Sequence, residues 1–171
     1  MKFKTSREER PKLKLELSWT DKIFELLGIT FTALMWVFAL FVISSSVDKI
    51  PTHYSFSGKP DSFGSKYTIL LLPAINLAVF ILLTILNKYP HVFNYPIKIT
   101  SENSLRQYTL ATKAIRFLKT TLSLLFLIIT YFTYKSSLNG ADFSGIWILP
   151  TIIIFIELPM LFYIWKATKI K

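Results

Sequence analysis

The residues of this chain that could do chemistry gather in one polar stretch, residues 48–66. Within it, His53 and Asp61 are an imidazole and a carboxylate, groups that can hold a metal ion, move a proton or recognise a ligand. Asp48 is the nearest further metal ligand, but full zinc sites take three or four protein ligands, so we expect no metal and no cofactor. No nucleophile or oxyanion pattern accompanies the pair, so we expect no catalytic residue and no enzyme activity. The alternative is that both side chains satisfy backbone groups of the loop.

The other distinctive residues of this stretch shape its backbone. Gly58 and Gly64 are expected to take backbone angles that other residues resist. Alternation over residues 52–56 permits a short strand. We therefore expect an ordered loop, whose candidate binding residues are Pro51, His53, Gly58, Asp61, Gly64 and Lys66.

A second candidate site lies in apolar surroundings. Glu157 falls near the middle of the apolar run 146–165, where a carboxyl is costly unless it is neutral or paired. One interpretation is a small transporter subunit or membrane enzyme that uses Glu157 within the bilayer. The other is a protonated Glu157 that hydrogen-bonds a neighbouring helix, with Asn76 as a candidate partner.

Four apolar runs must position these residues. Hydrophobic residues make up 52% of the 171 residues and the mean hydropathy is +0.45, which is high for a soluble domain. About 20 residues suffice to cross the roughly 30 Å hydrocarbon core of a bilayer. The runs therefore predict an all-α bundle of four transmembrane helices with an ordered extracytoplasmic loop; they cover residues 23–47, 67–87, 114–134 and 146–165.

The polar segments divide the chain and set its orientation. We expect a basic cytoplasmic tail over 1–22, two transmembrane helices flanking the loop over 23–87, and an amphipathic cytoplasmic segment with two further transmembrane helices over 88–171. Ser18 and Asp21 are candidate caps of the first helix. Of the 20 basic residues, 16 lie in the two termini and in segment 88–119, so the positive-inside rule places both termini in the cytoplasm of a multi-pass plasma-membrane protein. Cleavage of the first run as a signal peptide is the alternative.

The basic residues of segment 88–119 are expected to serve the membrane surface. Apolar residues recur there at helical spacing, and the charges occupy the rest of the helix surface, so we expect a basic face toward lipid headgroups. This face comprises Arg106, Lys113, Arg116 and Lys119.

Charge and cysteine content limit the remaining possibilities. The net charge of +10 is split between the flanks of apolar runs, so we expect lipid rather than nucleic acid as its partner. The chain has no cysteine, which excludes disulfides, thiol catalysis and thiolate metal sites. The oligomeric state is open.

The loop carries a family resemblance. Ile50-Pro-Thr-His-Tyr-Ser-Phe-Ser-Gly-Lys-Pro-Asp-Ser-Phe-Gly-Ser-Lys66, followed by Leu70-Leu-Leu-Pro73, resembles the bacterial membrane family called domain of unknown function 1648. Residues 93–108 also resemble the segment that comes after this domain in some members, so the resemblance covers about 25–120. The same domain begins immunity proteins of the SdpI type, which resist a secreted killing peptide. The resemblance implies a non-enzymatic membrane protein that binds or senses a peptide, a lipid headgroup or another membrane protein at the outer face, with immunity or signalling as forms of that role.

Overall fold

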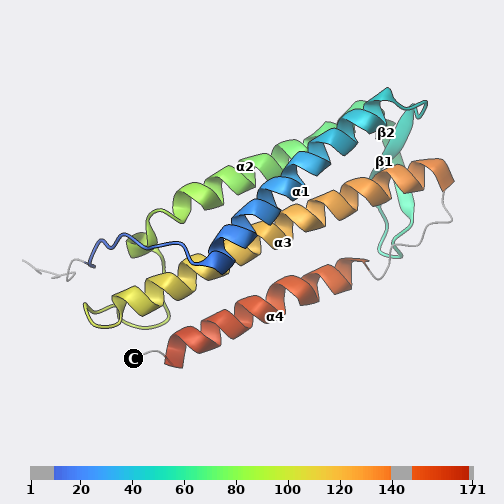
Figure 1. Ribbon diagram of the computed structural model, residues 1–171. Coiled ribbons are helices and arrows are strands. Elements are labelled where there is room, and N and C mark those ends of the chain that lie inside the picture. Colours follow the sequence, from blue (N-terminus) through green and yellow to red (C-terminus); the bar gives the residue numbers. More distant parts are fainter. Residues whose placement is uncertain (1–9, 140–147, 170–171) are drawn as a thin grey trace, which may run out of the picture.

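The computed structural model describes residues 10–139 and 148–169 of the chain (Figure 1). Its elements are α1 (Trp19–Ser44), β1 (Lys49–Tyr54), β2 (Pro60–Ser65), the 3-10 helix η1 (Lys66–Leu70), α2 (Leu71–Leu86), the 3-10 helix η2 (Pro90–Val92), α3 (Ser104–Asn139) and α4 (Ile148–Lys169). Residues 10–18 form an extended arm before α1. The tail residues 1–9 and residues 140–147, between the third and fourth helices, lie outside the described residues.

Three of the helices are long and apolar enough to cross a membrane. They are Trp19–Ser44, the continuous helical segment Lys66–Leu86, and Ser104–Leu138. At 1.5 Å per residue the 26 residues of α1 extend about 39 Å, more than the hydrocarbon core requires. The fold is therefore mostly helical, as predicted, with three candidate membrane-spanning helices among four helices. The expectation of a purely α-helical protein is wrong, because the motif loop folds into a two-stranded sheet.

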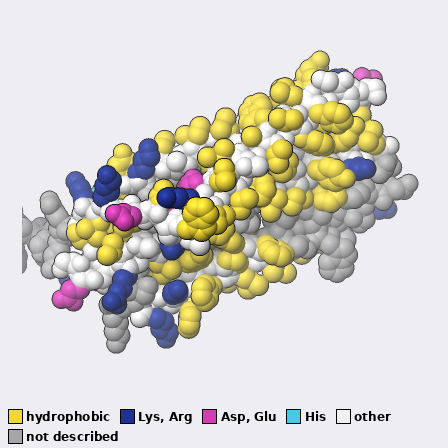
Figure 2. All heavy atoms as spheres, in the orientation of Figure 1, with side chains coloured by type: hydrophobic (Ala, Val, Ile, Leu, Met, Phe, Trp, Pro, Cys, Tyr) yellow, Lys and Arg dark blue, Asp and Glu magenta, His cyan; other side chains and the backbone are white. Residues whose placement is uncertain are grey.

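Helix α1 begins at the predicted cap. The backbone N–H of Asp21 donates to Ser18 Oγ at 3.3 Å, and the backbone N–H of Ser18 donates to Asp21 Oδ2 at 2.9 Å, a reciprocal capping box. The helix then buries one narrow face, which includes Gly28, Thr32 and Met35. Most other apolar side chains of α1 and α2 are exposed, and Figure 2 shows this apolar surface along the length of the molecule. An apolar surface of this extent on helices of this length is what contact with lipid requires.

Helix α3 is the central element of the bundle and contacts α1, α2 and α4. Its inner face carries buried hydroxyl side chains at helical spacing, namely Thr120, Ser123, Thr130, Thr133 and Ser136. Thr120, Ser123 and Thr130 donate to carbonyls one turn earlier, so these hydroxyls are satisfied without water. Small hydroxylated residues let helix backbones approach closely where no hydrophobic force drives association.

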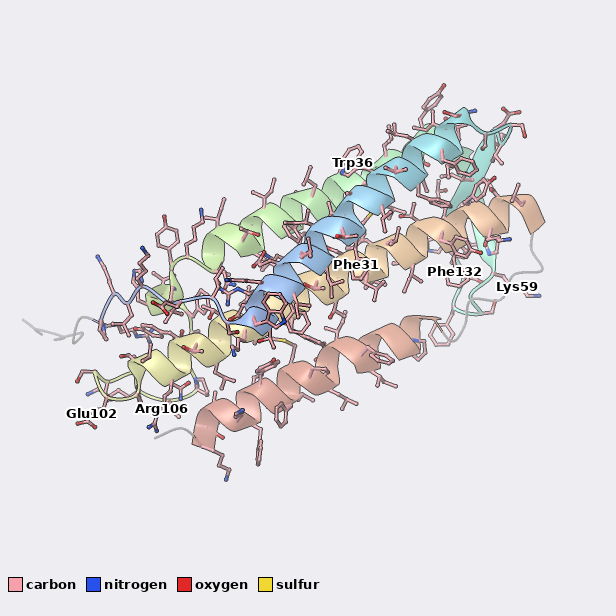
Figure 3. All side chains as sticks on the ribbon, in the orientation of Figure 1. Phe31, Trp36, Lys59, Glu102, Arg106 and Phe132 are labelled. Carbon is pink, nitrogen blue, oxygen red and sulfur yellow. The ribbon has the colours of Figure 1, made fainter. Side chains whose placement is uncertain are left out.

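The bundle has two different ends (Figure 1). Helices α1 and α3 run in the same direction and pack against each other, and α2 runs in the opposite direction beside them, so the sheet lies at the end where α1 and α3 finish. We call this the hairpin end. The arm 10–18 and the segment 87–103 meet at the opposite end, where Arg10 Nη1 donates to the carbonyls of His91 at 3.2 Å and Phe93 at 2.6 Å. Figure 3 shows Lys59 at the first end and Glu102 and Arg106 at the second.

Candidate functional site

The predicted loop is an antiparallel hairpin that lies across the hairpin end of the bundle. Ile50 pairs with Gly64, and Lys49 pairs with Ser65, where the hairpin meets the helices. Its turn is closed by the backbone N–H of Ser55, which donates to the Lys59 carbonyl at 2.8 Å. The loop is thus ordered, as expected, and its backbone presents fixed positions for the side chains of the motif.

An apolar cluster fastens the hairpin to the helices. Ile50 of β1 is 1% exposed and packs with Ile69 of η1 and with Ala39 and Val42 of α1. Tyr134 of α3 packs against the same cluster. Burial of a side chain such as isoleucine contributes about 1.5–3 kcal/mol, so the hairpin is part of the folded core rather than an appended loop.

The two motif glycines have different roles. Gly58 lies in the turn with φ 76°, a left-handed conformation that favours glycine, as predicted. Gly64 does not share this conformation, contrary to expectation, because it is not among the described residues with positive φ. A Cβ at Gly64 would lie 2.8 Å from Thr52 Cγ2, so any larger residue there would force the Thr52 side chain to move.

Lys66 ties the hairpin to α1. Its Nζ donates to the Ser45 carbonyl at 3.0 Å, just after the last turn of α1, and its backbone N–H donates to the Asp48 carbonyl at 3.1 Å. Pro51 is buried in β1. These two candidate binding residues therefore have structural roles. The exposed candidates remain accessible to a ligand.

Replacement of Lys66 by methionine should loosen the hairpin. The variant loses a charge-assisted hydrogen bond worth about 1.5 kcal/mol, and we expect faster amide exchange over Ile50–Tyr54. Lys59→Met is the matched control, because Lys59 is an exposed lysine in the turn of the same hairpin. Equal exchange in both variants would show that the Lys66–Ser45 contact does not hold the hairpin.

His53 and Asp61 form the pair that the sequence suggested. His53 Nδ1 lies 2.6 Å from Asp61 Oδ1, and the side chains are 69% and 45% exposed. The strand register explains this approach: the pairs Ile50–Gly64 and Tyr54–Pro60 belong to one antiparallel register, in which residue 53 lies opposite residue 61, although an irregularity between them pairs the backbone of His53 with Ser62. Residues that lie opposite each other in an antiparallel pair point to the same face, so the register of the flanking pairs brings the two side chains together.

The pair is a poor stabiliser, and both side chains are accessible to a ligand. An exposed ion pair contributes about 0–1 kcal/mol, which is little beside the burial of Ile50. Among the described residues, no group of three or more His, Cys, Asp or Glu side chains is placed to hold a metal ion. What the pair can do chemically is accept and donate hydrogen bonds to a ligand at the water-facing side of the hairpin.

The structure reveals a second polar cluster that the sequence prediction missed. Arg116 Nη1 lies 3.2 Å from Asp21 Oδ1, and Arg116 Nε lies 3.4 Å from Glu25 Oε1, an ion-pair distance without a hydrogen bond. Lys119 Nζ donates to Glu25 Oε2 at 2.7 Å and to Thr84 Oγ1 at 2.8 Å. These five residues, which we call the charge cluster, join α1, α2 and α3 toward the opposite end.

The charge cluster corrects the predicted basic face of α3. Arg116 is 8% and Lys119 is 1% exposed, so neither can reach lipid headgroups. Lys119 Nζ also lies 4.3 Å from the centroid of the Phe80 ring, a cation–π distance. Arg106 remains exposed, as predicted, and Lys113 is partly exposed.

One signal in the sequence could have located this cluster. Arg116 and Lys119 fall inside the apolar run 114–134, where charges are expected to pair within the protein. Asp21 and Glu25 lie one turn apart on the first helix and offer the matching charges. Glu25 lies beyond the first turn of α1, and it contacts Arg116 and Lys119 of α3.

The intramembrane candidates do not meet. Asn76 is 1% exposed and its Nδ2 donates to Thr32 Oγ1 of α1 at 3.0 Å, so it does bridge two helices, as predicted. Glu157 lies on an exposed part of α4, and within the described chain no ion pair involves it. The suggested hydrogen bond between Glu157 and Asn76 is therefore wrong. Pro159 is accommodated inside α4.

Comparison with known proteins identifies the family. The model of the family described as Domain of unknown function (DUF1648) matches residues 30–77, from the middle of α1 through the hairpin into α2. An "Uncharacterized protein" of the archaeon Archaeoglobus fulgidus is 30% identical in an alignment of 162 residues that covers 86% of this chain and 80% of that protein. No solved structure matches the chain. The hairpin motif and this similarity together show that the chain belongs to the Domain of unknown function (DUF1648) family.

Proposed function

We propose that this chain is a multi-pass membrane protein that binds or senses a ligand through its hairpin and catalyses no reaction. The observation that carries the proposal is the exposed His53–Asp61 pair on a hairpin that is fastened to the helix bundle. A preorganised site loses little conformational freedom on binding, which favours recognition. An immunity or signalling role would be one form of this activity.

An extended peptide, free or part of another membrane protein, is the ligand that fits best. Strand β2 has β1 on one side and, among the described residues, no strand on its other side. An exposed strand edge can take up a further strand through backbone hydrogen bonds, while pockets and polar side chains select the sequence. Phe56 in the turn and Phe63 of β2 are exposed and offer apolar contacts beside the pair.

The proposal also places the chain in the membrane. We infer a plasma-membrane protein in which α4 crosses with the three candidate spans, both termini are cytoplasmic and the hairpin faces outward. The support is the basic arm and the basic residues at the opposite end, since basic segments stay in the cytoplasm (Figure 2).

A photo-crosslinking experiment tests the binding site. With p-benzoylphenylalanine at Phe56, we expect a crosslinked adduct in intact cells that is lost when His53→Ala or Asp61→Asn is added. The same group at Tyr89, exposed at the opposite end, is the matched control site. Ser62→Ala is the control variant within the hairpin. An adduct at Phe56 that ignores His53 and Asp61 would contradict the assigned role of the pair.

Orientation and the competing function are checked in the same cells. The chain has no cysteine, so Lys59→Cys and Glu102→Cys report on the two ends cleanly. An impermeant thiol reagent should label the first only, and labelling of the second only would invert the proposed topology.

Glu157→Gln should leave the Phe56 adduct unchanged. Loss of the adduct in this variant would favour a role for Glu157 within the bilayer.

A further inference from the structure

A cavity of about 460 Å³ lies between α3, α4 and the segment that follows η2. This volume is within the range of about 300–1,000 Å³ that ligand sites occupy. Its walls are largely apolar and include Leu110, Ala111 and Ile115 of α3 with Met160 and Ile164 of α4. The cavity is remote from the hairpin, so it is a site separate from the one proposed above.

The end of the cavity away from the hairpin is built from polar groups of the opposite end. Gln107 Nε2 donates to the Ala167 carbonyl at 2.8 Å and so joins α3 to α4 beside the cavity. Tyr95 lines the cavity, and its hydroxyl donates to the Pro90 carbonyl at 2.9 Å. Burial raises the pKa of Tyr95, so this phenol stays neutral and keeps its donor role.

Arg10 supplies positive charge to the same place. Its guanidinium lies 5.6 Å from the centroid of the Tyr95 ring, and its Nη1 donates to the carbonyl of Phe93. Both Tyr95 and Phe93 line the cavity. Arg10 is only partly buried. Its Nε and Nη2 have no partner within the described part of the chain. A guanidinium with unused donors is suited to a phosphate group.

We propose that the cavity binds one acyl chain of an anionic phospholipid whose phosphate contacts Arg10. The proposal shares with the proposed function only the placement of the chain in a membrane. The apolar walls of the cavity suit an acyl chain. Because the bilayer is as apolar as these walls, they give little preference for one lipid over another. Preference among lipids must then come from the headgroup, and Arg10 is a charged group that contacts the lining residues Tyr95 and Phe93.

The test uses the full chain, purified in detergent and stripped of lipid. Native mass spectrometry with equal amounts of phosphatidylglycerol and phosphatidylcholine of the same acyl chains should show one retained lipid, with about a tenfold preference for phosphatidylglycerol. Arg10→Gln should abolish the preference without abolishing retention. Arg10 lies on the arm outside the helices, so this variant is expected to keep the bundle folded.

The cavity itself is tested by filling it. Ala111→Trp should reduce retention of both lipids, whereas Ala78→Trp, on an exposed part of α2, should not. Phosphatidylglycerol with a photoreactive acyl chain should label residues 107–115 and 160–167 of the unmodified chain, which keeps the proposal testable if Ala111→Trp does not fold. Equal retention of the two lipids by the unmodified chain, or label spread evenly over the exposed faces of α1 and α2, would overturn the proposal. Neither result would contradict the ligand-binding role proposed for the hairpin.

Discussion

Arg116→Leu is expected to lower the free energy of unfolding by about 3–5 kcal/mol, the typical cost of removing one partner from a buried ion pair. Asp21 is only 3% exposed, and Arg116 is the cation that compensates its charge. Without Arg116, Asp21 keeps its contacts with Ser18 but stays buried beside an apolar side chain. Denaturation of the purified chain in micelles, followed by circular dichroism, measures the loss.

Arg106→Leu is the matched control for this prediction. Arg106 lies on the same helix and is exposed (Figure 3), and surface substitutions of this kind change stability by about 0.5 kcal/mol or less. The double variant Asp21→Asn with Arg116→Leu should lose less stability than the two single variants combined, because no unpaired carboxylate remains buried. Equal losses for Arg116→Leu and Arg106→Leu would mean that the charge cluster does not stabilise the fold.

Gly28→Val is expected to lower the free energy of unfolding by about 1–3 kcal/mol through overpacking. Helix propensity alone would favour the change, since glycine is about 0.8–1.0 kcal/mol worse than alanine in a helix. Steric contacts outweigh this preference and make the change destabilising. A Cβ at Gly28 would lie 2.8 Å from Phe80 Cε2 and 3.3 Å from Thr120 Oγ1. Phe80 must then move, and it is the ring over which Lys119 lies.

Two further variants separate this steric effect from a general effect of valine. Ala33→Val places the same side chain on an exposed part of α1 and should be nearly neutral. Phe80→Leu should offset part of the loss caused by Gly28→Val, since it removes the atoms that the new side chain meets. Thermal unfolding of these variants and their combination in one detergent compares them. Similar melting temperatures for Gly28→Val and Ala33→Val would contradict close packing at Gly28.

The elements of this fold follow from local sequence, whereas their contacts do not. The presence of the helices, the Ser18 cap and the ordered loop follow from apolar runs and turn residues, which act over a few positions. The charge cluster depends on which faces of α1, α2 and α3 meet, so Arg116 and Lys119 look like surface residues until the helices are packed. Gly64 is a similar case. A side chain at this position would meet Thr52 of the neighbouring strand, whereas the backbone angles of Gly64 do not themselves favour glycine.

The candidate site divides in the same way. The sequence pointed to His53 and Asp61 through their residue types, but their contact depends on the register in which β1 pairs with β2, which the sequence did not predict. Asn76 was expected at a helix contact, and its partner proved to be Thr32 rather than Glu157. Residue type thus indicated which side chains were candidates for a functional site, and the tertiary structure determined which groups each of them contacts.

The unbroken length of α3 has a mechanical consequence. Tyr134 of this helix packs against the cluster that holds Ile50 of the hairpin, and Arg116 of the same helix is paired with Asp21. The two contacts are about 27 Å apart along a helix that rises 1.5 Å per residue and cannot shorten without breaking hydrogen bonds. We therefore expect a load applied to the hairpin to reach the charge cluster as a displacement of α3 along its own axis.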